Sequence, residues 1–254
     1  MGAMTTSLGN ALATTHGYWT LLRYALRNLK ALRIPPVREV FHRQIYFTGI
    51  QALKINAVLA LLCGALVATQ VTALIGGNSE LTVKVLIWIV VREVSSLLAA
   101  VVIIARSSAA IASELALMKI HNEFASLAQL RIPPLDYLIV PRIAGVTLAV
   151  LALSIYFQIV AVGGGLAISA AFQNISFMEQ LNRFLQIVGF TEFIVVVIKG
   201  CVFGMVIATV SCYHGINAMP SRTGVPKAAI RAVIQCLLFV FLLDALAAYL
   251  YWVF

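Results

Sequence analysis

The sequence predicts an all-α polytopic membrane protein with an N-terminal amphipathic interfacial helix, five transmembrane helices, and a cytoplasmic helix between the second and third. Of the 254 residues, 62% are hydrophobic and 11% are charged, whereas globular domains carry roughly 25% charged residues. The apolar residues form long runs, and about 20 such residues cross a bilayer as a helix. The high hydrophobicity also excludes a disordered chain.

The basic residues predict how the chain is oriented in its membrane. There are 18 Lys and Arg residues against 9 Asp and Glu, a formal charge of +9. The basic residues gather between apolar runs, which is typical of cytoplasmic loops and of contact with anionic lipid, so we expect no nucleic-acid partner. This places the N-terminus and segments 113–137 and 214–228 in the cytoplasm, with the C-terminus outside. Residues 1–15 have no basic residue and no sustained apolar core, so we expect no secretory leader.

The N-terminal segment predicts a helix that lies in the membrane interface. Between residues 18 and 32, apolar side chains recur at helical spacing, and Arg23, Arg27 and Lys30 take the opposite side. A helix packed on another protein surface is the alternative. We expect Pro35-Pro36 to end this helix. The predicted division is therefore an N-terminal segment over 1–43 and a membrane domain over 44–254.

Five apolar stretches predict the transmembrane helices, near 49–76, 84–112, 138–171, 187–213 and 229–253. The third contains Gly163-Gly164-Gly165, which favours either close helix packing or a break in the helix. The motif Leu-Arg-Ile-Pro-Pro occurs at 32–36 and again at 130–134. Because the flanks do not match, we interpret the two copies as helix stops and not as a duplicated domain.

Ionisable residues inside the apolar runs are the first candidates for function. Arg92 and Glu93 lie in the second run, Glu192 and Lys199 in the fourth, and Asp244 in the fifth. Charges within a span are costly, so a functional role is the default hypothesis. The alternative is a set of structural ion pairs, such as Glu93 with Lys199, that hold the helices together.

The segment 113–131 predicts a cytoplasmic amphipathic helix. Its apolar stripe is interleaved with residues of both charge signs, which favours docking on a protein partner over binding to lipid. The stripe consists of Leu117, Ile120, Phe124, Leu127 and Leu130.

No motif for catalysis, metal binding or nucleotide binding is present in the sequence. It lacks a GxSxG elbow, an HExxH pair and a phosphate-binding GxxxxGK[ST] loop. The four cysteines lie in or against apolar runs without metal-ligand spacing, so we expect buried thiols. We therefore expect no enzyme active site and no cofactor in this chain; any ATP would be bound by another chain.

Several motifs, in order from about residue 40 to the C-terminus, resemble those of the MlaE/YrbE-type permeases, the membrane subunits of MCE-associated ABC lipid transporters. The most specific is ARSSAAIASELALMKIHNEFASLAQLRIPPLDYLIVPR at 105–142. The others are RQIYFTGIQAL at 43–53, VVREV at 90–94, IKGCVFG at 198–204, SCYHG at 211–215 and GVPKAAIRAVIQ at 224–235, with Gln70 and Asp244.

The resemblance implies a homodimer in a bacterial inner membrane, with its C-terminus periplasmic. It implies a cytoplasmic ABC ATPase that carries ATP and Mg, a periplasmic MCE-domain protein and, in some systems, a STAS-domain protein. Segment 113–131 would be the coupling helix that docks on the ATPase, with Glu114, Leu117, Lys119, Ile120, Phe124 and Leu127 as its candidate contacts. Phospholipid would enter a cavity and meet Leu59, Leu62, Leu66, Gln70, Arg92, Glu93 and Lys199.

Two departures from the family pattern concern helix packing near that cavity. Val94-Ser95-Ser96 stands where the family often has Gly-Pro after its Arg-Glu-Leu, and Ser107 stands where it often has glycine. The expected function is the permease subunit of an ATP-driven phospholipid transporter. The alternatives are a proton-coupled secondary transporter using Glu93, Glu192 or Asp244, and a structural membrane anchor for an MCE complex.

Overall fold

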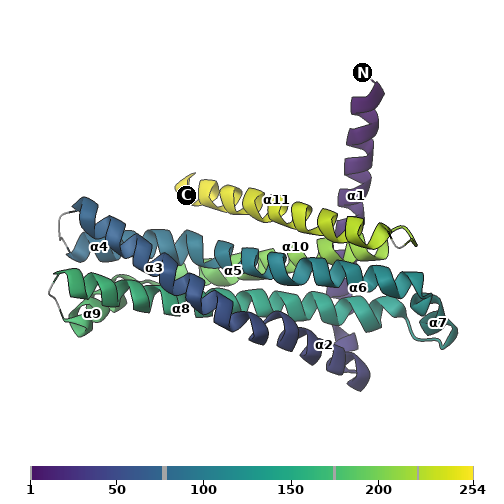
Figure 1. Ribbon diagram of the computed structural model, residues 1–254, viewed down its shortest axis with the longest axis horizontal. Helices are drawn as coiled ribbons and strands as arrows, with labels where there is room; N and C mark the ends of the chain where they lie inside the picture. The colour runs from purple at the N-terminus through teal and green to yellow at the C-terminus, as the bar shows by residue number, and fades with distance from the viewer. Residues whose placement is uncertain (1, 76–78, 174–175, 222, 254) are drawn as a thin grey trace. The chain divides into compact units, whose positions relative to one another are not determined.

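The computed structural model describes residues 2–75, 79–173, 176–221 and 223–253, and almost all of them are helical (Figure 1). No strand occurs among these residues. The prediction of an all-α protein is therefore confirmed.

The chain forms two compact units. Unit 1 comprises residues 1–48, 104–147 and 205–239, and unit 2 comprises 49–103, 148–204 and 240–254. Helices α8 (Val140–Gln173), α10 (Phe190–Ile216) and α11 (Gly224–Val253) contribute residues to both units. The predicted boundary between residues 43 and 44 lies within a helix, α2 (Pro35–Thr48).

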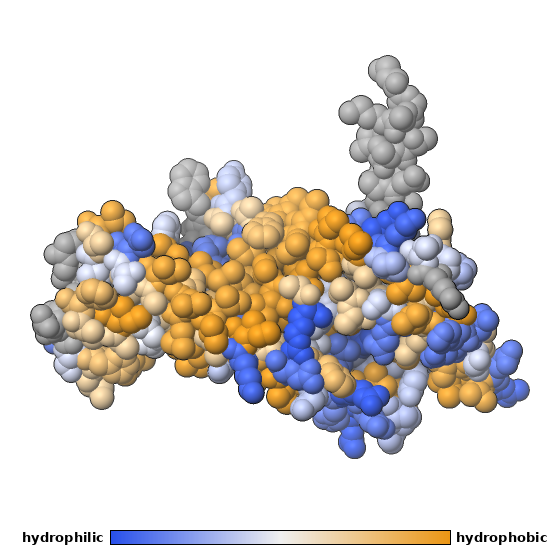
Figure 2. Space-filling view, in the orientation of Figure 1, coloured by the Kyte–Doolittle hydropathy of each residue, from blue (hydrophilic) through white to orange (hydrophobic). Residues whose placement is uncertain are grey.

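Unit 1 contains the N-terminal helices and the segment between the second and third apolar stretches. Hydrophilic side chains gather over α2, α6 and α7 on the face shown in Figure 2. Besides its parts of the shared helices, its elements are α1 (Gly2–Arg27), η1 (Leu29–Arg33), α2, η4 (Ile104–Ser108), α6 (Ala109–Ile120), α7 (Glu123–Gln129) and η5 (Leu135–Ile139).

Unit 2 is the more apolar part of the chain. Its core packs Phe157 and Leu166 of α8 against Val90 and Val91, all almost fully buried. Its own elements are η2 (Ile50–Ala52), α3 (Leu53–Ile75), α4 (Ser79–Leu86), η3 (Ile87–Val94), α5 (Ser95–Ile103) and α9 (Phe177–Ile187). In Figure 1, α4 lies beside α9 at one end of this unit.

Five stretches among the described residues are long and apolar enough to cross a membrane, which confirms the predicted number. They are Pro35–Leu74, Val83–Ile120, Leu135–Phe172, Phe190–Ile216 and Gly224–Leu250. Each extends beyond its predicted bounds at one end or both, because polar and charged residues next to the apolar run continue the same helix. The predicted turn at residues 76–78 lies outside the described residues.

The path of the N-terminal segment differs from the prediction. The first helix ends at Arg27, and a 3-10 turn, η1, follows it. Pro35 then begins α2, whereas we expected the proline pair to act only as a stop. The reason is that proline fits the first turn of a helix, where its missing N–H would have no intrahelical partner. The Asn28 side chain at the break donates a hydrogen bond to Asp136 (2.9 Å).

Tyr18 attaches α1 to the rest of unit 1. Its ring packs edge-on against Tyr213 at a centroid distance of 4.6 Å and against Phe239 at 5.9 Å. Its hydroxyl bonds to His214 (3.0 Å) and donates to Gln235. Burial raises the pKa of the Tyr18 phenol to about 12, so the hydroxyl remains a donor at neutral pH. At Tyr18, therefore, the first helix packs on protein. The next residue, Trp19, is exposed.

The triple glycine does not break its helix, because α8 is continuous from Val140 to Gln173. Of the two possibilities open from the sequence, the structure shows close packing. A Cβ at Gly164 would lie 2.7 Å from the Leu61 side chain. The nearest approach is made by Gly64 of α3, where a Cβ would lie 2.0 Å from the carbonyl oxygen of Ala161. Helices α3 and α8 therefore touch backbone to backbone.

This contact predicts that Gly64→Ala destabilises the protein. The new methyl group meets backbone that cannot rotate away, so the free energy of unfolding should fall by about 1–3 kcal/mol. The matched control is Gly163→Ala, because a Cβ there has no atom within 4 Å. Denaturant titration of the purified protein in detergent measures both. Equal stability of the two variants would contradict the predicted helix contact.

Candidate functional site

The ammonium group of Lys199 is the centre of a charge cluster in unit 2. Lys199 is only 6% exposed, although it lies within an apolar helix, α10. Its Nζ donates to Glu93 Oε2 (2.6 Å), to Asp244 Oδ1 (3.0 Å) and to the carbonyl oxygen of Arg92 (3.1 Å). An ammonium group has three N–H donors, so each one has an acceptor. The cluster therefore joins η3, α10 and α11.

The local backbone explains how Lys199 reaches these partners. Arg92 and Glu93 lie in a π-helical stretch, η3, within the second span, and π-helical turns are frequent at functional sites. On the other side, Gly200 lets α10 approach α8. A Cβ at Gly200 would lie 3.1 Å from the Cα of Leu151, closer than most side chains tolerate.

Arg92 lies at the edge of the same cluster. Its guanidinium carbon is 6.0 Å from the centre of the Trp88 ring, within reach of a cation–π contact. It lines a groove of about 350 Å³ together with Glu93, Lys199 and the apolar residues Val195, Ile198, Ala247 and Leu250. A groove lined by both charged and apolar residues suits an amphipathic ligand, whose charged and apolar parts need different surroundings.

A second groove in unit 2 contains two of the other predicted contacts. Leu66 and Gln70 of α3 line it with Leu74, Val85 and Ile89, and its volume is about 330 Å³. Leu59 and Leu62 belong to the same exposed side of α3 but do not line this groove. The structure thus divides the predicted lipid contacts between the α3 surface and the Lys199 cluster.

Glu192 has a structural contact of its own. Its carboxylate accepts a hydrogen bond from the backbone N–H of Gly189 (3.0 Å) in the first turn of α10. A carboxylate in this position stabilises the start of a helix, both by satisfying an N–H and by its charge.

The predicted single helix over 113–131 is wrong, because the chain turns at residues 121–122. Helix α6 ends at Ile120, and Asn122 has a left-handed backbone with φ of 57° before α7 begins at Glu123. Asparagine is among the few residues other than glycine that adopt this conformation readily. Residues 113–120 therefore extend the second span, and only 123–129 form a separate short helix.

The six predicted coupling residues differ in their contacts and in their exposure. Glu114 pairs with Arg142 (2.8 Å), and Lys119 donates to the carbonyl oxygen of Ile216 at the end of α10 (2.8 Å). A cation at this position satisfies an open carbonyl of the helix terminus. Leu117 is 45% exposed. The other three residues, Ile120, Phe124 and Leu127, are half-buried.

Two features of the charged residues were missed from the sequence. The sequence predicts that Asp244 is a charge within a span but does not place it among the lipid contacts, although it touches Lys199 directly. The sequence analysis does not predict that Arg142 is buried, yet it is 3% exposed. The sequence does contain a signal for Arg142, because this residue lies inside the predicted apolar stretch 138–171. No group of His, Cys, Asp and Glu within the described parts of the chain could hold a metal ion.

The five long apolar helices and the buried charge cluster define a multi-pass membrane protein with polar groups inside its spans. Comparison with known proteins defines it further. Residues 41–250 match the family model for the permease MlaE, so the chain belongs to the MlaE family of ABC transporter permeases.

Individual relatives agree with this assignment. The chain is 28% identical over 208 residues to a probable ABC transporter permease protein of Rickettsia typhi, covering 80% of each chain. It is 29% identical over 211 residues to a probable ABC transporter permease protein of Synechocystis, covering 78% of this chain and 76% of the relative. It is 25% identical over 223 residues to the intermembrane phospholipid transport system permease protein MlaE of Haemophilus influenzae, covering 83% of each.

The cluster predicts that Lys199→Met destabilises unit 2, because Glu93 and Asp244 then face each other without their shared cation. Removing one partner of a buried ion pair costs about 3–5 kcal/mol, and we expect about 2–4 kcal/mol because the Glu93 side chain is 39% exposed. Adding Glu93→Gln and Asp244→Asn should recover at least half of the loss. Denaturant titration measures all variants, with Lys54→Met on the exposed side of α3 as the control. No recovery in the triple variant would show that charge repulsion is not the cause.

Proposed function

We propose that this chain is the permease subunit of an ATP-driven transporter that moves phospholipid between the bacterial inner membrane and a periplasmic MCE-domain partner. Membership of the MlaE family supports the proposal, and one relative is named for intermembrane phospholipid transport. The observation that carries it is the Lys199 cluster beside an apolar groove. A phospholipid has this same division between a charged headgroup and apolar chains.

In this proposal, Arg92 acts on the lipid headgroup while Lys199 holds the surrounding helices. Lys199 has three acceptors within the protein. The Arg92 side chain lines two grooves of unit 2 and is therefore positioned to meet a ligand in them. An arginine can bind two phosphate oxygens at once, which suits it to the headgroup. The acyl chains would lie along the exposed leucines of α3, Leu59, Leu62 and Leu66.

The energy source in the proposal is a separate ATPase, which docks on the cytoplasmic side of a homodimer of this chain. The short helix α7 and the exposed Leu117 at the end of α6 form the proposed contact. A periplasmic MCE protein receives or supplies the lipid, and a STAS-domain protein is a further candidate partner. The N-terminus is cytoplasmic and the C-terminus periplasmic in this arrangement, as the distribution of basic residues predicts.

Lipid transfer should slow when Glu93, Lys199 and Asp244 are replaced by uncharged residues that preserve the fold. A simple exchange of Glu93 and Lys199 is not a clean test, because the new carboxylate at position 199 would face Asp244. Glu93→Gln, Lys199→Met and Asp244→Asn together remove the three paired charges with little change in side-chain size, and leave Arg92 in place. We expect at least about a tenfold slower lipid transfer between proteoliposomes containing the ATPase and MCE partners, since intramembrane charges are retained at a cost.

The control for this measurement is Glu179→Gln, which changes a charge of the same unit that pairs with Arg183 and lines neither of the two Arg92 grooves. Wild-type transfer by the triple variant would contradict a role for the cluster and favour a structural anchor. Transfer that continues without the ATPase but follows a proton gradient would favour a proton-coupled transporter.

Docking of the ATPase should be lost in Leu117→Asp. The side chain is 45% exposed in this chain alone, so an aspartate costs little here but would become a buried charge in an apolar interface. We expect the yield of co-purified ATPase to fall about tenfold or more. The control is Met219→Asp, because Met219 is also exposed and belongs to the same unit but lies outside 113–131. Wild-type recovery of the ATPase with Leu117→Asp would contradict the proposed contact.

A further inference from the structure

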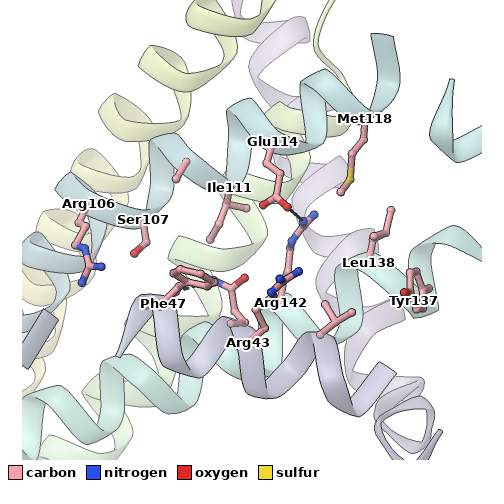
Figure 3. A pocket seen from close by; sticks show the side chains of 14 residues that line it. Arg43, Phe47, Arg106, Ser107, Ile111, Glu114, Met118, Tyr137, Leu138 and Arg142 are labelled. Carbon is pink, nitrogen blue, oxygen red and sulfur yellow. Dashed lines mark hydrogen bonds and ion pairs between the residues drawn. The ribbon is translucent and has the colours of Figure 1, made fainter. Parts of the chain in front are cut away.

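Unit 1 contains a pocket of about 440 Å³ with an unusual concentration of arginine. Arg43 of α2, Arg106 of η4 and Arg142 of α8 line it, together with one acidic residue, Glu114 of α6. The formal charge of these four side chains is therefore +2. Figure 3 shows the Glu114 carboxylate reaching the Arg142 guanidinium, with Arg43 near them.

The strongest evidence for a ligand is a buried, unpaired donor of Arg142. Its side chain is 4% exposed, and its Nη2 pairs with Glu114 (2.8 Å). Its Nη1 is buried and has no hydrogen-bond partner among the described residues. A buried guanidinium donor without an acceptor costs free energy, so its presence calls for an explanation such as a bound anion.

The backbone brings the arginines together by a close helix contact. A Cβ at Gly145 of α8 would lie 3.0 Å from the Cβ of Gln44 in α2. This approach places Arg43, next to Gln44, at the same pocket as Arg142, one helical turn before Gly145. Neutral polar groups from Ser107 and Tyr137 complete the polar wall, and Phe47, Ile111 and Leu138 line the apolar part.

We propose that this pocket binds a phosphate group, with Arg43 and Arg142 as its cationic contacts. A phosphate has enough acceptor oxygens to take both the free Nη1 of Arg142 and donors from Arg43, and arginine is well suited to it. A phospholipid headgroup and a free phosphate ion share this chemistry. The apolar wall favours the lipid, because it can receive the start of an acyl chain.

The length of the second span agrees with a site at headgroup depth. The stretch Val83–Ile120 has 38 residues, whereas about 20 helical residues cross the hydrocarbon core. Part of the helix must therefore extend into a headgroup region or beyond. Arg106 and Glu114 belong to the half of this stretch that ends at the polar turn of residues 121–122.

This site is separate from the Lys199 cluster and does not depend on transport. All residues of the pocket belong to unit 1, whereas Arg92, Glu93, Lys199 and Asp244 belong to unit 2. A phosphate bound here would be retained by a protein that has lost transfer activity, so its binding can be measured on its own.

Equilibrium binding to the full-length chain in a phosphate-free maltoside detergent tests the proposal. The probes are soluble dihexanoyl phosphatidylglycerol, dihexanoylglycerol without phosphate, and inorganic phosphate. We expect Arg43→Gln and Arg142→Gln each to weaken binding of the phosphatidylglycerol about tenfold. The matched control is Arg38→Gln, an exposed arginine of α2 outside the pocket, which should bind as the wild type does.

The probes separate the possible sources of the phosphate. Inorganic phosphate that binds as tightly as phosphatidylglycerol identifies the free ion as the ligand, and much weaker binding identifies the lipid. The proposal is overturned if dihexanoylglycerol binds equally well, if Arg38→Gln weakens binding as much as Arg43→Gln, or if only Lys199→Gln abolishes it. Because Arg43 is exposed, we expect the Arg43→Gln variant to fold. Its binding therefore decides the outcome even if the Arg142→Gln variant does not fold.

Discussion

The need to compensate charge inside an apolar environment shapes much of unit 2. Lys199 is almost fully buried, and it meets its three acceptors only because η3, α10 and α11 come together around it. A charge in the interior of a membrane protein is costly unless it is paired or hydrogen-bonded. The contact therefore constrains three helical segments through residues at least 45 positions apart in the sequence, and any rearrangement of one segment must keep or exchange these partners.

Small residues provide the second constraint, because they decide which helices can touch. Gly64 faces the backbone of Ala161, and Gly200 faces the backbone of Leu151. In lipid, helices gain little from the hydrophobic effect on association, so close backbone packing contributes much of their attraction. These two glycines bring α3 and α10 onto the same long helix, α8, which carries much of the buried core of unit 2.

The sequence predicted the elements of the fold better than their junctions. Five apolar runs and the charges within them can be read directly, because each depends on local composition. The turn at Asn122 and the start of α2 at Pro35 could not be predicted with the same certainty, since asparagine and proline are compatible with more than one local structure. The contact between Lys199 and Asp244 depends on which helices are neighbours, and a pattern of single residues does not contain that information. Arg142, by contrast, was visible as a charge at the edge of an apolar run.

The composition of the Lys199 cluster has an electrical consequence. Two cations, Arg92 and Lys199, and two anions, Glu93 and Asp244, have a formal sum of zero when all four are ionised. The membrane potential acts on net charge, with about 2.3 kcal/mol for each elementary charge moved across 100 mV. A displacement of the four groups as one body does no net work against that field. The cluster can therefore be polar without acting as a voltage sensor.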